Sequence, residues 1–178
     1  MTDIELIAMR RRVREELRSL QASPLSPPSG DAWTPRQVLQ HILQAEHNAI
    51  VLLEKLVTKA GPLPSSAPAG PLPIRDELLG FDLERAMSIP AARGTEPEGE
   101  IDDDALGALE TSVQARFHAL LDLGKAHDLG GISFPHPLAG RLNFYEWLVF
   151  GVVHEELHLR LLRRNVESGA LGRASKEP

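Results

Sequence analysis

The stretch NFYEWLVFGVVHEELHLRLLRR, residues 143–164, predicts a long helix that is apolar over most of its length. It opens with N-F-Y-E, in which Asn143 can cap the helix while Glu146 reaches back to the cap. His154 and His158 follow four residues apart, so both lie on one face of the helix. Gly151 stands one turn earlier, where a glycine costs about 1 kcal/mol relative to alanine. We interpret it as leaving space beside the histidines.

The same start signal occurs at two other places in the chain. T-D-I-E begins at Thr2, and T-P-R-Q begins at Thr34 with Pro35 at the first helical position. A third helix start is expected near Asp102 or Asp103. The predicted helices run from Thr2 to about Gln21, from Pro35 to about Ala60, from Asp102 or Asp103 to Leu123 with Gly124 as the terminating glycine, and from Phe144 to about Glu167.

These helices predict an all-α fold, a four-helix bundle. No segment shows a convincing two-residue alternation of apolar and polar residues with turn signals on both sides. GISFPHP (131–137) is too short and too proline-rich for a central strand. We expect one domain over residues 1–167, followed by a flexible tail over 168–178. The connection 61–101 begins with a proline-rich stretch, 61–73, that is expected to be extended and exposed. Residues 75–87 look like a short helix, and a crossover here would make the second and third helices parallel.

The composition narrows the possible partners. The chain has 178 residues, 42% of them hydrophobic, and a net charge of −6, which disfavours binding to nucleic acid or to an anionic membrane surface. It has no cysteine, so disulfides, cysteine zinc sites and a cysteine nucleophile are excluded. Neither a signal peptide nor a membrane-spanning run is recognisable, and a cytoplasmic protein is expected.

Three histidines are predicted to face one interior. His41 lies on the apolar stripe of the 35–60 helix, between Val38 and Ala45, and His154 and His158 share a face of the last helix. Neutral imidazoles bind divalent metals such as Zn²⁺, Ni²⁺ or Fe²⁺, and three protein ligands leave a position for water, as in catalytic sites. The alternative is a set of hydrogen-bonded core histidines. His118, His127 and His136 fall outside these helical stripes and are interpreted as non-ligands.

HEELH, residues 154–158, also matches the H-E-x-x-H pattern of zinc proteases. Leu161 and Arg164 stand where the extended pattern needs glycine and histidine, and no sheet is available to hold a peptide. The protease interpretation is therefore rejected. Glu155 remains a candidate catalytic base or a group supporting a ligand, although a solvated acid on the helix surface is the simpler expectation.

WTPRQVLQHILQAE (33–46) and HPLAGRLNFYEWLVFGVVHEELHLRLLRR (136–164) together resemble the DinB-like superfamily, which includes thiol-dependent S-transferase-like bundles. The resemblance covers nearly the whole chain. It implies an up-down-down-up bundle, often a homodimer, with nickel or zinc bound by three histidines that map onto His41, His154 and His158. Many relatives carry a glutamine where this chain has Leu161. Members of the superfamily are not expected to bind DNA.

Two function classes follow from these expectations. The first is a metal-dependent enzyme acting on a small-molecule substrate, either a thiol S-transferase or a hydrolase. Because the chain lacks cysteine, thiol chemistry would need a low-molecular-weight thiol such as mycothiol or bacillithiol as cofactor. The second is a metal-binding or stress-associated bundle without turnover, favoured by few polar groups near the site, with Glu155, Asn48 and His47 as the candidates. Purely structural histidines are a third possibility.

Overall fold

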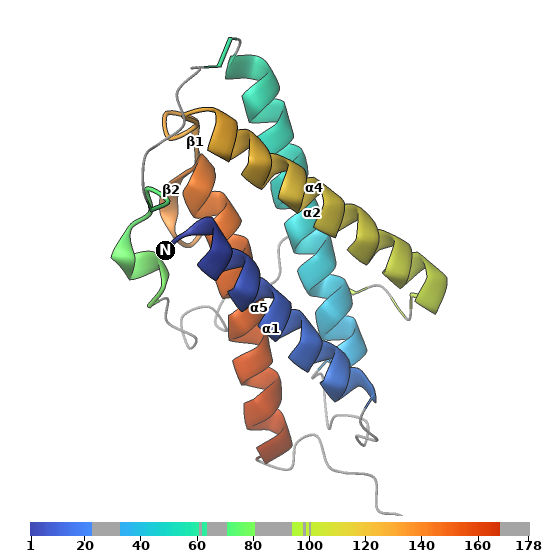
Figure 1. Cartoon of the computed structure of the whole chain (residues 1–178). Helices are drawn as coiled ribbons and strands as arrows, with labels where there is room; N and C mark the ends of the chain where they lie inside the picture. The colour runs from blue at the N-terminus through green and yellow to red at the C-terminus, as the bar shows by residue number, and fades with distance from the viewer. Residues whose placement is uncertain are drawn as a thin grey trace, which may run out of the picture.

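The structure is a computed structural model that describes residues 1–22, 33–60, 62–63, 71–80, 94–97, 99 and 101–167. Within these residues, four long helices make up the fold. The helices are α1 (Asp3–Ala22), α2 (Pro35–Ala60), α4 (Asp103–Ala126) and α5 (Phe144–Glu167). Figure 1 shows α2 and α4 running toward one end of the bundle and α1 and α5 running toward the other. The all-α prediction is confirmed: the fold is a four-helix bundle. No helix in the described ranges has a stretch long and apolar enough to cross a membrane.

Each of the three predicted capping boxes is present. The backbone N–H of Thr2 donates to Glu5 at 2.7 Å, and the N–H of Glu5 donates back to the Thr2 hydroxyl at 3.2 Å. Thr34 and Gln37 exchange the same pair of bonds at 2.9 and 3.2 Å, as do Asn143 and Glu146, both at 2.9 Å. These bonds satisfy backbone N–H groups that have no partner inside the helix, which is why the helix starts could be read from sequence.

Helix α5 is buried on most of its sides. It packs against α1 and α2, and α2 also packs against α4. The histidine face, which the sequence predicts to look into the interior, is covered only in part. Gly151, His154 and His158 are partly exposed, whereas Val152, Val153 and Leu159 are buried. Apolar residues occur on more than one face of this helix, so helical spacing alone could not tell which face is most deeply buried.

A short hairpin precedes α5 and contradicts the expectation that the chain has no strands. β1 (Ser133–His136) pairs antiparallel with β2 (Gly140–Asn143). Pro135 is tolerated because a two-stranded ribbon has only edge strands. Gly140 has a φ of 71°, a left-handed conformation that glycine adopts at little cost. The hairpin is small, and the four helices still define the fold class.

The segment 71–80 lies against the start of α5. It contains η1, a 3₁₀ turn at Asp76–Leu78, and the Arg75 guanidinium pairs with Glu146 at 2.6 Å. A short helix was expected over residues 75–87, and the described residues of that range contain this turn. Most of the proline-rich stretch 61–73, residues 81–93 and the expected tail 168–178 lie outside the described residues.

Gly124 does not end α4, as the sequence suggested, because the helix continues to Ala126. It is instead a close-packing glycine. A Cβ built on Gly124 would lie 2.9 Å from Cε1 of Tyr145 and 3.3 Å from Cε1 of Phe144. The Tyr145 ring cannot easily move away, since its hydroxyl donates to the carbonyl oxygens of Gly124 and His127 at 3.0 and 3.1 Å.

Alanine at position 124 is therefore expected to destabilise the protein, although alanine favours helices. The clash should cost about 1–3 kcal/mol and outweigh a helix-propensity gain of roughly 1 kcal/mol. Gly107 in the same helix is the control, because a Cβ there would meet no atom within 4 Å. Urea unfolding should show Gly107→Ala stabilised and Gly124→Ala destabilised. Stabilisation of both variants would contradict the packing role.

Candidate metal centre

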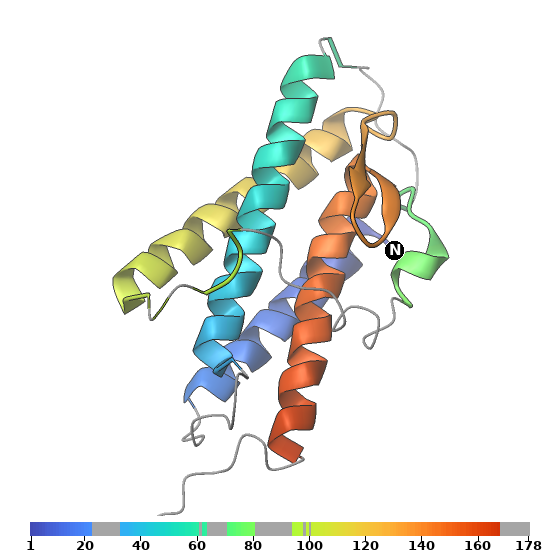
Figure 2. The ribbon, with the colours of Figure 1, turned by 180° about the vertical axis from the view of Figure 1, so that it is seen from behind.

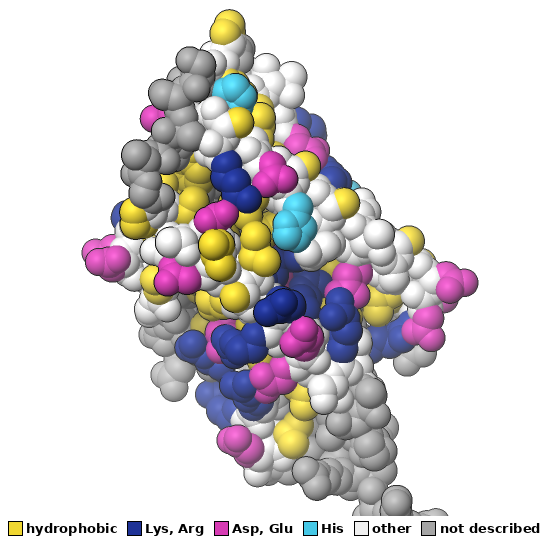
Figure 3. Space-filling view, in the orientation of Figure 1, with side chains coloured by type: hydrophobic (Ala, Val, Ile, Leu, Met, Phe, Trp, Pro, Cys, Tyr) yellow, Lys and Arg dark blue, Asp and Glu magenta, His cyan; other side chains and the backbone are white. Residues whose placement is uncertain are grey.

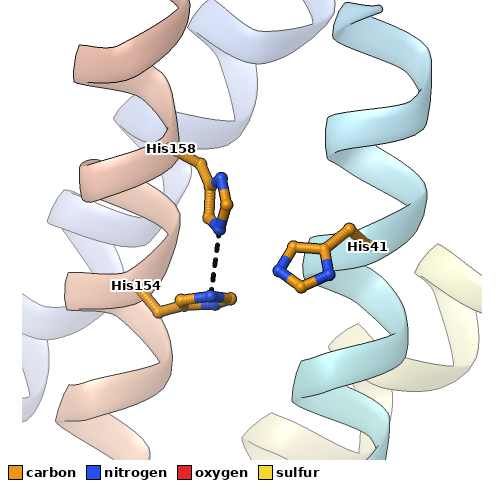
Figure 4. A group of neighbouring side chains, drawn as sticks. All are labelled: His41, His154 and His158. Carbon is orange, nitrogen blue, oxygen red and sulfur yellow. Dashed lines mark hydrogen bonds between the residues drawn. The ribbon is translucent and has the colours of Figure 1, made fainter. Parts of the chain in front are cut away.

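Three histidines from two helices form one group. His41 comes from α2, and His154 and His158 come from α5; the ring nitrogens that could bind a metal all lie within 4.8 Å of one another. Figure 4 shows the three rings turned toward the space between the helices, and Figure 2 shows α2 and α5 side by side. Among the described residues this is the one such group of three or more His, Asp or Glu side chains.

His41 is oriented by a backbone carbonyl. Its side chain is buried, and Nδ1 lies 2.7 Å from the carbonyl oxygen of Thr95. A carbonyl oxygen only accepts hydrogen bonds, so Nδ1 carries the proton. Burial lowers the pKa of His41, and in the neutral ring Nε2 carries the lone pair. Metal-binding histidines in proteins are commonly held in this way by the ring nitrogen that does not bind the metal. Sequence reasoning missed Thr95, because it lies in the long connection and no spacing links it to His41.

His154 and His158 point their Nε2 atoms at each other across 3.0 Å. Two nitrogens bound to one ion at about 2.0–2.1 Å, with tetrahedral or octahedral angles, lie roughly 3 Å apart, so this separation fits a shared metal. Burial, with a further contribution from His41, lowers the pKa of His158 to about 3. Burial also lowers the pKa of His154 well below its ordinary value. Both rings are therefore neutral at physiological pH, which metal binding requires.

Aromatic side chains line the surroundings of the three rings. The Trp33 ring lies 4.9 Å from His41 between centroids, and the Phe150 ring stacks near His154 at 6.4 Å. A Cβ on Gly151 would meet no atom within 4 Å, so there is open space one turn from His154. The histidines thus have aromatic neighbours, and there is open space on the same helix one turn from His154.

Glu155 is not the solvated acid that the sequence suggested. It is 1% exposed, and its Oε1 accepts from Arg14 at 2.7 Å and lies 3.7 Å from Arg10. Both arginines belong to α1, so the carboxylate points toward α1 and is held there by charge. Burial raises its pKa to about 7. Its assignment as a catalytic base finds no support in these contacts and stays a prediction.

The other two polar candidates, His47 and Asn48, are not part of the three-histidine group. His47 contacts Arg116 of α4 at 3.1 Å, and Asn48 is exposed. His118 bonds to Gln114 at 2.6 Å. His136 lies in β1 with its ring 4.1 Å from the Phe150 ring, a position near the site that the sequence did not indicate.

His136 is expected to make the protein less stable in acid. Its Nδ1 accepts the backbone N–H groups of Leu138 and Ala139, both at 3.2 Å, and protonation of that atom would break both bonds. Burial lowers its pKa to about 4, against 6.5 in the unfolded chain. The unfolded state therefore binds the proton first, and stability falls as the pH drops from about 6.5 toward 4.

The loss attributable to His136 should be on the order of 2 kcal/mol between pH 7 and pH 5. His136→Asn keeps an acceptor for the two N–H groups and does not titrate in this range. Urea unfolding of the metal-free proteins at both pH values should show a smaller pH dependence for the variant. An unchanged dependence would mean that the pKa of His136 is the same in the folded and unfolded states.

Comparisons with known proteins agree with the fold. A family model described as the DinB superfamily matches residues 5–162. The crystal structure of TT2238, described as a four-helix bundle protein, shares 22% sequence identity with a TM-score of 0.52, over 91% of this chain and 98% of that chain. At this identity the similarity establishes the fold alone. No curated protein matches the sequence.

Proposed function

This chain belongs to the DinB superfamily, and on that premise we propose that His41, His154 and His158 together bind one divalent metal ion, nickel or zinc. The observation that carries the proposal is the convergence of their three ring nitrogens within 4.8 Å. The hydrogen bond from His41 to Thr95 and the neutral state of both α5 histidines support it, since each leaves a lone pair for a cation.

We further propose that the site makes the protein a metal-dependent enzyme of thiol S-transferase or hydrolase type. A bound divalent ion would lower the pKa of a coordinated thiol or water, and three protein ligands leave a position for one. Because the chain has no cysteine, the thiol would be a separate low-molecular-weight cofactor. Trp33 and Phe150 would keep bulk water from the rings, and the open space beside Gly151 would admit a small-molecule substrate.

A metal-binding bundle without turnover is the second candidate. It is favoured by the composition of the site, which contains no carboxylate among the described residues. Glu155, the nearest acid in sequence to His154, is bound to Arg14 instead. Without a positioned acid or base, proton transfer would depend on the substrate or on water.

Metal analysis and a thiol-consumption assay separate these candidates. Untagged protein should contain close to one nickel or zinc per chain, and metal-loaded protein should consume a low-molecular-weight thiol with an electrophile, or hydrolyse an ester. Stoichiometric metal without turnover in either assay would favour the bundle without turnover. Protein that takes up no metal when either ion is supplied would refute the metal centre itself.

A further inference from the structure

An open cavity on the surface is lined by eight residues, four of which are arginines of α1. It lies between α1 and α4 and has a volume of about 330 Å³, within the range of small-molecule sites. Figure 3 shows arginine and lysine side chains gathered in the middle of this face of the molecule. The polar lining residues are Arg10, Arg11, Arg14 and Arg18 of α1 and Gln114 and His118 of α4.

Two of these arginines are buried, and one is incompletely paired. Arg10 and Arg14 are 3% and 4% exposed. Arg14 donates from Nη2 to Glu46 and Glu155, but its Nε and Nη1 have no hydrogen-bond partner among the described residues. Nη1 lies 3.8 Å from the Glu110 carboxylate, beyond hydrogen-bond range. A buried guanidinium with unused N–H groups is costly, and in native proteins it usually indicates a missing partner.

The charges around the cavity do not cancel. Arg10 and Arg14 pair with Glu46 and Glu155, and Arg18 pairs with Glu110 at 2.5 Å. Arg11 is exposed, and within the described part of the chain it has no ion-pair partner. Four arginines therefore face three carboxylates, in a protein whose net charge is −6. A local excess of positive charge in an acidic chain is the electrostatic pattern of an anion site.

We propose that this cavity binds a small molecule through an oxyanion, either a phosphate ester or a carboxylate. Planar guanidinium groups match both oxyanions, with two N–H groups directed at two oxygens. Arg11 and Arg18 would contact the ligand from the rim, and Arg14 would add its positive charge from the inner wall. The cavity lies between α1 and α4, whereas the three histidines lie between α2 and α5. The proposal is thus independent of the metal centre.

Arg18 and Arg12 provide a matched pair for the test. Both belong to α1, both side chains are 53% exposed, and each pairs with one glutamate, Arg18 with Glu110 and Arg12 with Glu156 of α5. Only Arg18 lines the cavity. Calorimetric titration with inorganic phosphate and, separately, with succinate, at constant ionic strength, should show saturable binding of at least one of them. Arg18→Gln should weaken it about tenfold, and Arg12→Gln should leave it within about twofold.

The comparison of phosphate with succinate tells a phosphate ligand from a carboxylate ligand. His158→Ala distinguishes this site from the metal centre, because an anion bound to the metal would be lost in that variant and retained in Arg18→Gln. Loss of anion binding in His158→Ala with binding retained in Arg18→Gln would overturn the proposal. Equal weakening of anion binding in Arg12→Gln and Arg18→Gln would also overturn it, because it indicates nonspecific attraction. The absence of saturable binding of both anions up to roughly 10 mM would overturn it as well. Retained binding in His158→Ala with loss in Arg18→Gln would support it.

Discussion

Replacement of His158 by alanine is expected to weaken nickel or zinc binding by at least about 100-fold. Loss of a group that merely supports a ligand typically costs 10–100-fold in affinity, and loss of a ligand should cost no less. His158 also faces His154 at 3.0 Å, so its removal leaves two nitrogens from two different helices. Two ligands hold an ion less firmly than three, and water would complete the coordination. Competition with a coloured metal chelator at pH 7 measures the affinity directly.

A matched pair on α2 gives the control for this prediction. His41→Ala should reproduce the loss, whereas His47→Ala, six residues along the same helix, should bind metal like the parent protein. His47 contacts Arg116 of α4 and is not part of the group of three. Equal metal affinity in His41→Ala, His47→Ala and the parent would show that the histidines of this group are structural. Circular dichroism should confirm that each variant keeps its helices.

Glu46→Ala is expected to cost about 3–5 kcal/mol of unfolding free energy, the range for removing one partner of a buried ion pair. Glu46 is 6% exposed and accepts from Arg10 at 2.8 and 3.0 Å and from Arg14. Its loss would leave two buried guanidinium groups sharing Glu155. Since Glu46 joins α2 to α1, the loss should also loosen the contact between these helices. Urea unfolding with a two-state fit measures the change.

Glu54→Ala is the control for Glu46→Ala. Glu54 lies on the same helix and pairs with an arginine, Arg116, at 2.5 Å, but its side chain is 42% exposed. Exposed ion pairs contribute about 0–1 kcal/mol, so this variant should be close to the parent in stability. Glu46→Gln keeps a hydrogen-bond acceptor without the charge, so its stability should lie between those of Glu46→Ala and Glu54→Ala. Equal stability of Glu46→Ala and Glu54→Ala would show that water reaches the arginines and screens them.

Features decided within a few residues could be predicted from the sequence. The helix starts at Thr2, Thr34 and Asn143 depend on bonds between residues three apart, and all three occur as expected. The end of α4 could not be predicted in the same way. Glycine often ends a helix, which is why Gly124 was expected to end α4. A glycine stands there instead because the Tyr145 ring of α5 leaves too little space for a Cβ.

The sequence by itself determined the four helices, the class of the fold and the choice of His41, His154 and His158, because each depends on local bonding or on helical spacing. Only the tertiary structure decided what surrounds these residues. It brought Thr95 to His41, turned Glu155 toward Arg14 and gathered the arginines of α1 beside α4. The physical reason is that the partner of a buried charge is chosen by the packing of helices distant in sequence, and helical periodicity carries no information about which helix that will be.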